Sequence, residues 1–163
     1  MSSAADKIVS EWAIELSRCL PLFGHRNWIV VADSAYPAQS NPGIQTITAN
    51  ESHLEVLQEV LAAIEQSGHV KANVYTDREL AFVKEMDAPG VSSYRDALSD
   101  MVGERRRTLP HEEIIAKLDH AAELFQVLII KTDMKIPYTS VFLELDCAYW
   151  NDSAEQRLRS NLK

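Results

Sequence analysis

Short apolar segments alternate along this chain with longer segments of helical periodicity, and this alternation constrains the fold more than any other feature. The clearest strand candidate is 28–32, a run of apolar, mostly branched residues between Gly24 and Asp33. A strand that is apolar at every position has to be covered on both faces, because either face would otherwise meet water. The alternation therefore predicts an α/β fold, a three-layer α/β/α sandwich around a mostly parallel or mixed sheet.

The remaining segments can be assigned in the same way. Apolar residues spaced three or four apart predict helices over 5–20, 52–66 and 110–124, and Ser52 with Glu55 predicts a capping box on the second. Further strands are predicted over 44–48, 71–75, 127–130 and 140–145, whereas 77–101 is polar and weakly helical. A chain of 163 residues without a linker or repeat is about one domain in size, so 1–163 is predicted to form a single unit.

Composition narrows the class of partner. The chain has 16 Lys and Arg against 24 Asp and Glu, and the resulting net charge of −8 repels a phosphate backbone, so nucleic acid is not predicted as a partner. No apolar stretch reaches the roughly 18 residues that a membrane-spanning helix requires, so no membrane partner is predicted. Two cysteines, Cys19 and Cys147, suit reduced thiols in a cytoplasmic protein.

Proton-transfer groups flank the first strand. Asp33 follows its carboxyl end, where α/β folds gather functional side chains, and His25 precedes it. A histidine and a carboxylate suit general acid–base chemistry near neutral pH without a cofactor. Within one chain they would lie at opposite ends of a strand about 20 Å long, so they meet only if two copies of an oligomer combine or the strand is shorter. The simpler interpretation is that each forms a local turn.

Hydroxyls and further histidines supply other candidates. Tyr138 and Ser140 lie before the last long strand, where they can bind a polar ligand or simply form a turn. His111 and His120 are nine residues apart, which is not the spacing of a zinc-protease helix, so no metal site is predicted. His53 lies at a predicted helix end, where surface capping is the ordinary interpretation.

The chain has one basic run, and it lacks the common nucleotide motifs. Arg105, Arg106 and Arg107 could bind a phosphate or a partner's carboxylates, although a solvated face is the simpler interpretation. Only five glycines occur, and they form neither a phosphate-binding loop nor a nucleophile elbow. No cofactor is therefore predicted.

Several motifs, taken in order, resemble a known family. Residues 24–40 contain Gly-His, a short apolar strand and then Asp-Ser-Ala-Tyr-Pro, which resembles the start of the D-ribose pyranase and L-fucose mutarotase family. Residues 43–50 and the helix after them resemble the next segment of the fucose branch, and Pro137-Tyr138-Thr139-Ser140 resembles the closing motif. The resemblance covers most of the chain and favours the fucose-like branch over the ribose branch.

The resemblance implies a reaction and an assembly. Members of the family interconvert the anomers or ring forms of a free reducing monosaccharide without metal or nucleotide. It implies that His25 is the acid–base group, that Asp33 binds sugar hydroxyls and that Tyr138 contributes to the pocket. It also implies a ring-shaped homo-oligomer, often a decamer, with sites at subunit interfaces, which would bring His25 of one copy to Asp33 of another.

Two positions depart from the family pattern. Ser140 stands where the closing motif usually ends in asparagine, and it offers one hydroxyl in place of an amide. A basic residue is expected on the late helix, but an ungapped alignment back from Tyr138 places Ala116 there, with His111 and His120 as nearby candidates for binding substrate. These departures motivate a second hypothesis, a non-catalytic carbohydrate-binding or regulatory module on the same fold.

Overall fold

A computed structural model describes residues 9–162, which contain six strands and five α-helices. The strands are β1 (Trp28–Ala32), β2 (Ile44–Thr48), β3 (Val70–Asp77), β4 (Arg106–Leu109), β5 (Val127–Lys131) and β6 (Val141–Cys147). The helices are α1 (Glu11–Cys19), α2 (His53–Ser67), α3 (Val91–Val102), α4 (His111–Ala122) and α5 (Asp152–Ser160). None of the helices in this part of the chain is both long enough and apolar enough to cross a membrane.

The strands form one mixed sheet in the order β2-β5-β1-β6-β3-β4. β1, β2 and β5 are parallel to one another, as are β3 and β4. β6 lies between β1 and β3 and is antiparallel to both. Because of this arrangement, the first residues of β6 lie beside the carboxyl ends of β1 and β3. Side chains that follow β1, follow β3 and precede β6 therefore meet at the same end of these strands.

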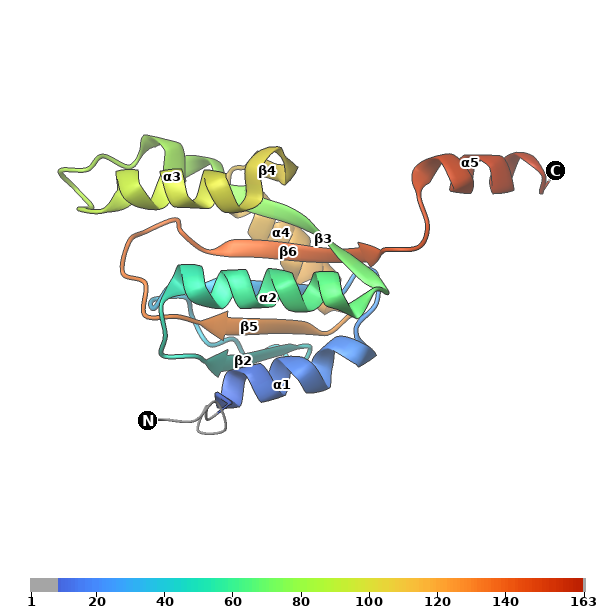
Figure 1. Ribbon diagram of the computed structural model, residues 1–163, viewed down its shortest axis with the longest axis horizontal. Coiled ribbons are helices and arrows are strands. Elements are labelled where there is room, and N and C mark those ends of the chain that lie inside the picture. Colours follow the sequence, from blue (N-terminus) through green and yellow to red (C-terminus); the bar gives the residue numbers. More distant parts are fainter. Residues whose placement is uncertain (1–8, 163) are drawn as a thin grey trace, which may run out of the picture.

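Helices cover both faces of the sheet. α1, α2 and α3 pack on one face and α4 on the other (Figure 1). Alternate residues of β1 divide between the two cores: Ile29 and Val31 pack beneath α1 and α2, whereas Trp28 and Val30 pack against Ile114 of α4. The predicted three-layer α/β/α architecture with a mixed sheet is confirmed.

Most predicted elements are confirmed as well. β1 and β2 have the predicted bounds, and α2, α4, β3, β5 and β6 begin and end within three residues of the expected positions. The polar segment expected to be weakly helical contains α3 and a short 3₁₀ turn at Arg78–Phe82. Apolar periodicity located these elements because each of them buries one side against the sheet.

Two predictions about helix starts are wrong. Val9 and Ser10, which were predicted to be helical, precede α1 and are not part of it, whereas residues 5–8 of the predicted helix lie outside the described part of the chain. The carbonyl of Ser10 accepts the first hydrogen bonds of α1, from the backbone N–H groups of Ala13 and Ile14. On α2, the side chain of Ser52 makes no capping hydrogen bond, so the predicted capping box does not form.

Two elements were not predicted at all. The basic run keeps Arg105 and Arg107 exposed, as a solvated face requires, but it also contributes the edge strand β4. β4 pairs with β3 along one side and ends the sheet. The other element is α5, which follows β6 after a short linker and lies apart from the three layers (Figure 1).

Candidate functional site

A pocket of about 510 Å³ lies at the edge of the sheet where β1 and β3 end and β6 begins. Loops beyond the carboxyl ends of strands form its walls, as is usual for binding sites in α/β folds. The residues that line it are Asp33, Ala35, Tyr36, Pro37, Gln39, Asp77, His111, Glu112, Ile115, Pro137, Tyr138 and Ser140. Four of the six residues predicted from the sequence as site residues are in this set.

A carboxylate and an imidazole pair on one wall of the pocket. Asp77 is the last residue of β3, His111 is the first residue of α4, and Nδ1 of His111 lies 3.0 Å from both carboxylate oxygens of Asp77. Burial raises the pKa of Asp77 to about 6, although the hydrogen bonds and charge of His111 act to lower it. With Nδ1 bonded to the carboxylate, Nε2 is the ring nitrogen left to exchange a proton with a ligand.

A second carboxylate fixes the helix start that carries this imidazole. Both oxygens of Glu79 accept a hydrogen bond from the backbone N–H of His111, each at 3.0 Å. Tyr138 and Phe142 contact the imidazole edge to face, with ring centroids 5.9 and 6.3 Å from that of His111. Backbone and ring of His111 are thus both held in place before any ligand binds.

Asp33 and Ser140 face this pair and bind each other. The hydroxyl of Ser140 donates to Oδ1 of Asp33 at 2.6 Å, and the backbone N–H of Asp33 donates to the same hydroxyl at 3.1 Å. The two residues are 107 positions apart in the sequence, and the antiparallel pairing of β1 with β6 brings them together. Serine therefore serves here as a bridge between the two loops, a role for which its short reach is sufficient.

Two aromatic residues complete the walls of the pocket. Tyr138 is 41% exposed and has a left-handed backbone conformation with φ of 61°, which is rare for a residue other than glycine and is typical of ligand-binding loops. The hydroxyl of Tyr36 is buried at the pocket wall without a hydrogen-bond partner of good geometry among the described residues. A polar ligand can satisfy such a group.

A buried polar network lies behind the pocket. Nδ1 of His53 lies 3.0 Å from the hydroxyl of Thr132, and Nε2 lies 3.1 Å from the hydroxyl of Tyr94. The hydroxyl oxygen of Thr132 also lies 2.8 Å from the carbonyl oxygen of Ala32, and that of Tyr94 lies 2.7 Å from the carbonyl oxygen of Thr139. These carbonyls immediately precede Asp33 and Ser140, so the network holds both loops from behind.

The protons of this network are constrained by the charge of His53. If both hydroxyls donate to carbonyls, both ring nitrogens must donate to the hydroxyls, and the imidazole must be a cation. Burial instead lowers the pKa of His53 to about 4, so the ring is neutral at neutral pH and carries one N–H. One of the two hydroxyls must therefore donate its hydrogen bond to the ring nitrogen that carries no proton. The expectation that His53 caps a helix at the surface is wrong, because its side chain is 1% exposed.

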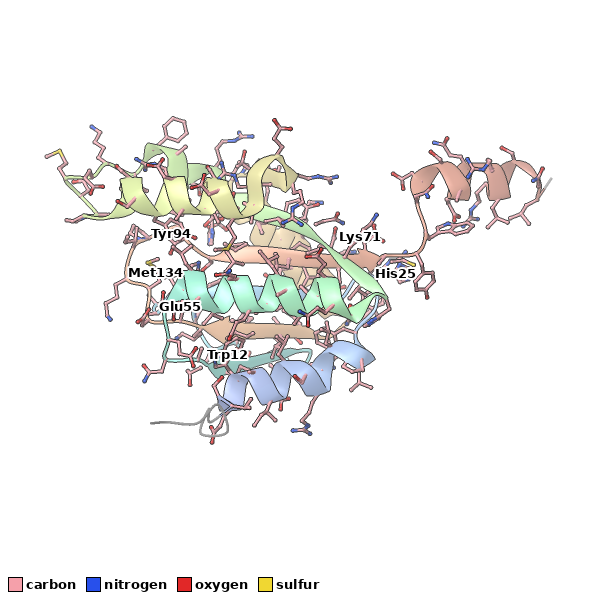
Figure 2. The ribbon with its side chains drawn as sticks, in the orientation of Figure 1. Trp12, His25, Glu55, Lys71, Tyr94 and Met134 are labelled. Carbon is pink, nitrogen blue, oxygen red and sulfur yellow. The ribbon has the colours of Figure 1, made fainter. Side chains whose placement is uncertain are left out.

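Two predicted histidines lie away from the pocket. His25 lies in the turn before β1, at the end of the molecule opposite Tyr94 and Met134, which border the pocket loops (Figure 2). His120 lies near the end of α4, one side chain of a separate hollow that Arg26 and Trp28 also line. Within one chain, the structure does not bring either histidine to Asp33.

Comparison with known proteins decides the family. A sequence model of the RbsD / FucU transport protein family matches residues 8–147. The chain belongs to this family. The match spans every motif on which the resemblance was based, so the recognition of the ribose pyranase and fucose mutarotase family from sequence is confirmed. Comparison with curated proteins found no significant match.

Solved structures agree on the fold of this RbsD / FucU member. Bacillus subtilis RbsD complexed with D-ribose matches with a TM-score of 0.58 and 19% identity, over 90% of this chain and 98% of that one. The fucose mutarotase in complex with L-fucose from Streptococcus pneumoniae matches with a TM-score of 0.54 and 19% identity, over 81% and 91%. FucU from Bifidobacterium longum matches with a TM-score of 0.53 and 15% identity, over 82% and 94%.

The late helix, on which the family resemblance led us to expect a basic residue, is α4. The ungapped alignment pointed to Ala116, which is exposed on α4 outside the pocket lining. His111 begins the same helix and lines the pocket. The late helix therefore contributes one basic side chain to the pocket, five positions before Ala116 in the sequence.

Sequence reasoning missed Asp77, Glu79 and the network behind the pocket. A signal for Asp77 was present, because the strand predicted over 71–75 is followed by polar residues just as β1 is followed by Asp33. Glu79 and His53 carried no such signal, since their partners are distant in the sequence. Among residues 9–162, no three His, Cys, Asp or Glu side chains gather as a metal site would require.

Proposed function

We propose that the chain interconverts the anomers or ring forms of a free reducing monosaccharide by general acid–base catalysis without a cofactor. The observation that carries this proposal is the Asp77–His111 pair on one pocket wall with the Asp33–Ser140 pair on the other. The pocket volume of about 510 Å³ accommodates a monosaccharide. Family membership and the D-ribose and L-fucose named in two similar structures support the same class of ligand.

The proposed reaction is balanced in protons. A base takes the proton of the anomeric hydroxyl while an acid delivers a proton to the ring oxygen, the bond between the anomeric carbon and the ring oxygen breaks, and a free aldehyde forms. Rotation about the adjacent carbon–carbon bond and closure by the reverse steps give the other anomer. His111 is suited to one of these transfers because the hydrogen bond to Asp77 orients its ring and leaves Nε2 to exchange a proton with the sugar. Asp33, Ser140 and Tyr138 would bind sugar hydroxyls.

The charge of the pocket favours a neutral sugar. Asp33, Asp77 and Glu112 contribute carboxylates, and none of the described residues that line the pocket is Lys or Arg. An anionic ligand such as a sugar phosphate would meet repulsion from these carboxylates. The apolar surfaces of Pro37 and Ile115 can contact the C–H face of a sugar ring.

We also propose that a neighbouring copy completes the site with His25. The family resemblance assigns His25 the acid–base role, yet within a chain it lies at the opposite end of the sheet from the pocket (Figure 2). In a ring-shaped homo-oligomer such as a decamer, one copy would present this end to the pocket of the next. His25 and His111 would then provide the two proton-transfer groups that mutarotation needs.

Magnetization-transfer NMR tests the reaction directly. Exchange between the anomeric signals of L-fucose, D-ribose and D-galactose is measured with and without catalytic amounts of the protein. We expect faster exchange for at least one sugar and its loss in His111→Ala, whereas Glu113→Ala, an exposed position on the same helix turn, should retain it. Unchanged exchange across the panel, or full activity of His111→Ala, would contradict the proposal.

Mixing two inactive variants tests the contribution of the neighbouring copy. His25→Ala keeps the pocket and His111→Ala keeps His25, so a mixed assembly contains some sites with both groups intact. When equal amounts mix at random, about one quarter of the sites contain both histidines, so about one quarter of the activity of the unmodified protein should return. Restoration shows that the two histidines act across copies, and its absence after verified subunit exchange shows that they do not.

One observation supports the alternative hypothesis, that the chain is a non-catalytic sugar-binding module. Ser140 already bonds Oδ1 of Asp33, which reduces the hydrogen-bonding capacity left for a ligand. This alternative predicts broadening of sugar resonances on binding without faster anomer exchange. The NMR experiment separates the two hypotheses because it reports binding and exchange in the same spectra.

A further inference from the structure

α5 is an unpartnered amphipathic helix outside the family domain. The family match ends at residue 147, and α5 begins at Asp152, so this helix is an addition to the domain. None of its residues is buried, and it projects away from the three layers (Figure 1). Leu158 and Leu162 are four apart, fall on one side of the segment and are 46% and 68% exposed, and Trp150 before the helix is 44% exposed. These exposed apolar side chains are available for contact with another protein surface.

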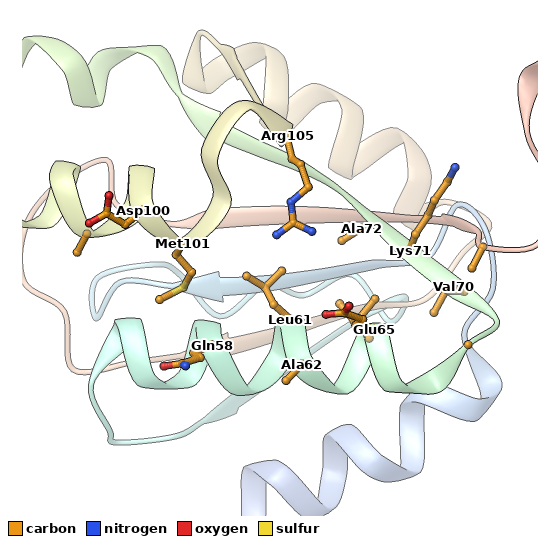
Figure 3. A pocket seen from close by; sticks show the side chains of 14 residues that line it. Gln58, Leu61, Ala62, Glu65, Val70, Lys71, Ala72, Asp100, Met101 and Arg105 are labelled. Carbon is orange, nitrogen blue, oxygen red and sulfur yellow. The ribbon is translucent and has the colours of Figure 1, made fainter.

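A groove lies beside the residues that immediately precede this segment. It has a volume of about 900 Å³, lies between α2, α3 and the start of β3, and includes Ala148 in its lining. Figure 3 shows Leu61, Ala72 and Met101 on its floor, with the guanidinium of Arg105 reaching over them. Charged side chains of both signs border the apolar floor, among them Glu65.

Helix and groove match in length and in charge pattern. The α2 residues that line the groove run from Gln58 to Glu65, and Gly68 extends the lining to about 15 Å at the helical rise, while the nine residues of α5 span about 14 Å. The first turn of α5 carries Asp152 and Glu155, and its last turn carries Arg157 and Arg159. In Figure 3, Lys71 and Asp100 lie toward opposite ends of the groove, so the acidic first turn of α5 can face Lys71 while its basic last turn faces Asp100.

We propose that α5 of one copy binds in this groove on a second copy. The backbone N–H of Ala148 donates to the carbonyl of His69, which holds the chain against the sheet up to that residue. After Ala148, two hydrogen bonds stabilise the start of α5. The side chain of Asn151 accepts a hydrogen bond from the backbone N–H of Ala154 as the helix cap, and the indole N–H of Trp150 donates to the carboxylate of Glu155 at 2.7 Å. With this start α5 points away from the groove of its own chain (Figure 1), so it would enter the groove of another copy and not its own.

The proposal is independent of the sugar chemistry. The groove and the pocket share no lining residue. A chain without catalytic activity could exchange helices in this way, and an active one could fail to do so.

Cross-linking between two different variants tests the exchange. In a Cys147→Ser background, one population carries Ala62→Cys at the exposed groove rim and the other carries Leu158→Cys, while the native Cys19 is buried. After subunit mixing, a short bis-maleimide should join the two populations into a covalent dimer. Gln156→Cys, on the opposite side of α5, is the matched control and should join with Ala62→Cys at least about tenfold less.

Other results would overturn the proposal. If Ala62→Cys and Leu158→Cys react only when both are in the same chain, α5 folds back onto its own groove. If they react in neither arrangement, the groove is not its binding site. A second measurement needs no cross-link: Leu158→Asp should speed subunit exchange about tenfold relative to Gln156→Asp, because it places a charge on the apolar side. Equal exchange rates for these two exposed substitutions would contradict the assignment.

Discussion

Asp77 and His53 are buried titratable groups that change stability with pH in opposite directions. Burial raises the pKa of Asp77 from 3.8 to about 6, so between these values the folded chain binds more protons than the unfolded chain, and the free energy of unfolding falls as pH rises. Burial lowers the pKa of His53 from 6.5 to about 4, so here the unfolded chain binds more protons and the free energy of unfolding rises with pH. The two effects oppose each other between about pH 4 and pH 6.

Replacement of Asp77 with asparagine should reveal its part of this balance. The substitution removes the buried charge that forms as pH rises, so the stability of Asp77→Asn relative to the unmodified chain should be greater at about pH 7 than at about pH 4.5. Urea unfolding at the two pH values measures the difference. Asp146→Asn, a partly buried carboxylate away from the pocket, controls for general charge removal. A relative stability that does not change with pH would refute a raised pKa.

Replacement of His53 with glutamine should have the opposite effect. Glutamine keeps hydrogen-bonding capacity but does not titrate, so the stability of His53→Gln relative to the unmodified chain should be greatest at about pH 4.5 and should decrease toward about pH 7. The same unfolding measurement applies, with the exposed His120→Gln as control. A decrease of similar size in the control would show that burial of the ring is not the cause.

Single site residues were predictable from sequence only where a neighbouring strand or a local motif indicates them. Asp33 was found because it follows an apolar strand, and Tyr138 and Ser140 because they form a recognisable motif. His53 was misjudged because its partners, Tyr94 and Thr132, are 41 and 79 positions away. Local sequence cannot indicate that a histidine at a helix start is covered by two such distant hydroxyls.

At the scale of elements, the start of α4 depends on a residue outside the helix. Glu79 lies in the 3₁₀ turn after β3 and accepts the first N–H of α4 with both carboxylate oxygens. If the proposed reaction is correct, Glu79→Ala should lower kcat/KM about ten- to hundredfold, because His111 would lose its fixed position while its chemistry remains. Anomer-exchange NMR measures the loss, and circular dichroism should show an intact fold.

Glutamine at the same position provides the sharper comparison. Glu79→Gln retains one carbonyl oxygen that can accept the N–H of His111, so it should recover most of the activity that Glu79→Ala loses. Equal activity of Glu79→Ala and the unmodified chain would show that the bond does not position His111. Equal loss in both variants would indicate that the charge of Glu79, and not its bond to the helix, is what matters.

Elements were predictable where burial leaves a periodic pattern. β1 was found at its correct bounds because all five of its residues are buried. β4 was missed because it is a short edge strand with the sequence Arg-Arg-Thr-Leu, and edge strands are commonly charged. α5 was missed because it is a short, mostly polar helix, and none of its residues is buried within its own chain. The order of the strands in the sheet arises from distant pairings that no local pattern records.

At the scale of the whole molecule, charge should select among sugars. The net charge is −8 and the pocket carries carboxylates without Lys or Arg among its described lining residues. D-ribose should therefore bind at least about tenfold more tightly than D-ribose 5-phosphate at low salt, and the ratio should decrease as ionic strength rises. NMR titration measures both affinities. Tighter binding of the phosphate would contradict the proposed preference for neutral sugars.

The position of β6 has a consequence for how the protein is made. β1 and β3 carry Asp33 and Asp77, but they are not neighbours in the sheet: β6, the last strand to leave the ribosome, lies between them. Until residue 147 has emerged, the two halves of the sheet have no shared partner, and the loops that face each other across the pocket cannot be brought together. Synthesis of nearly the whole domain therefore precedes any capacity to bind a ligand, and a nascent chain cut short before β6 would have all the acidic side chains of the site and no site.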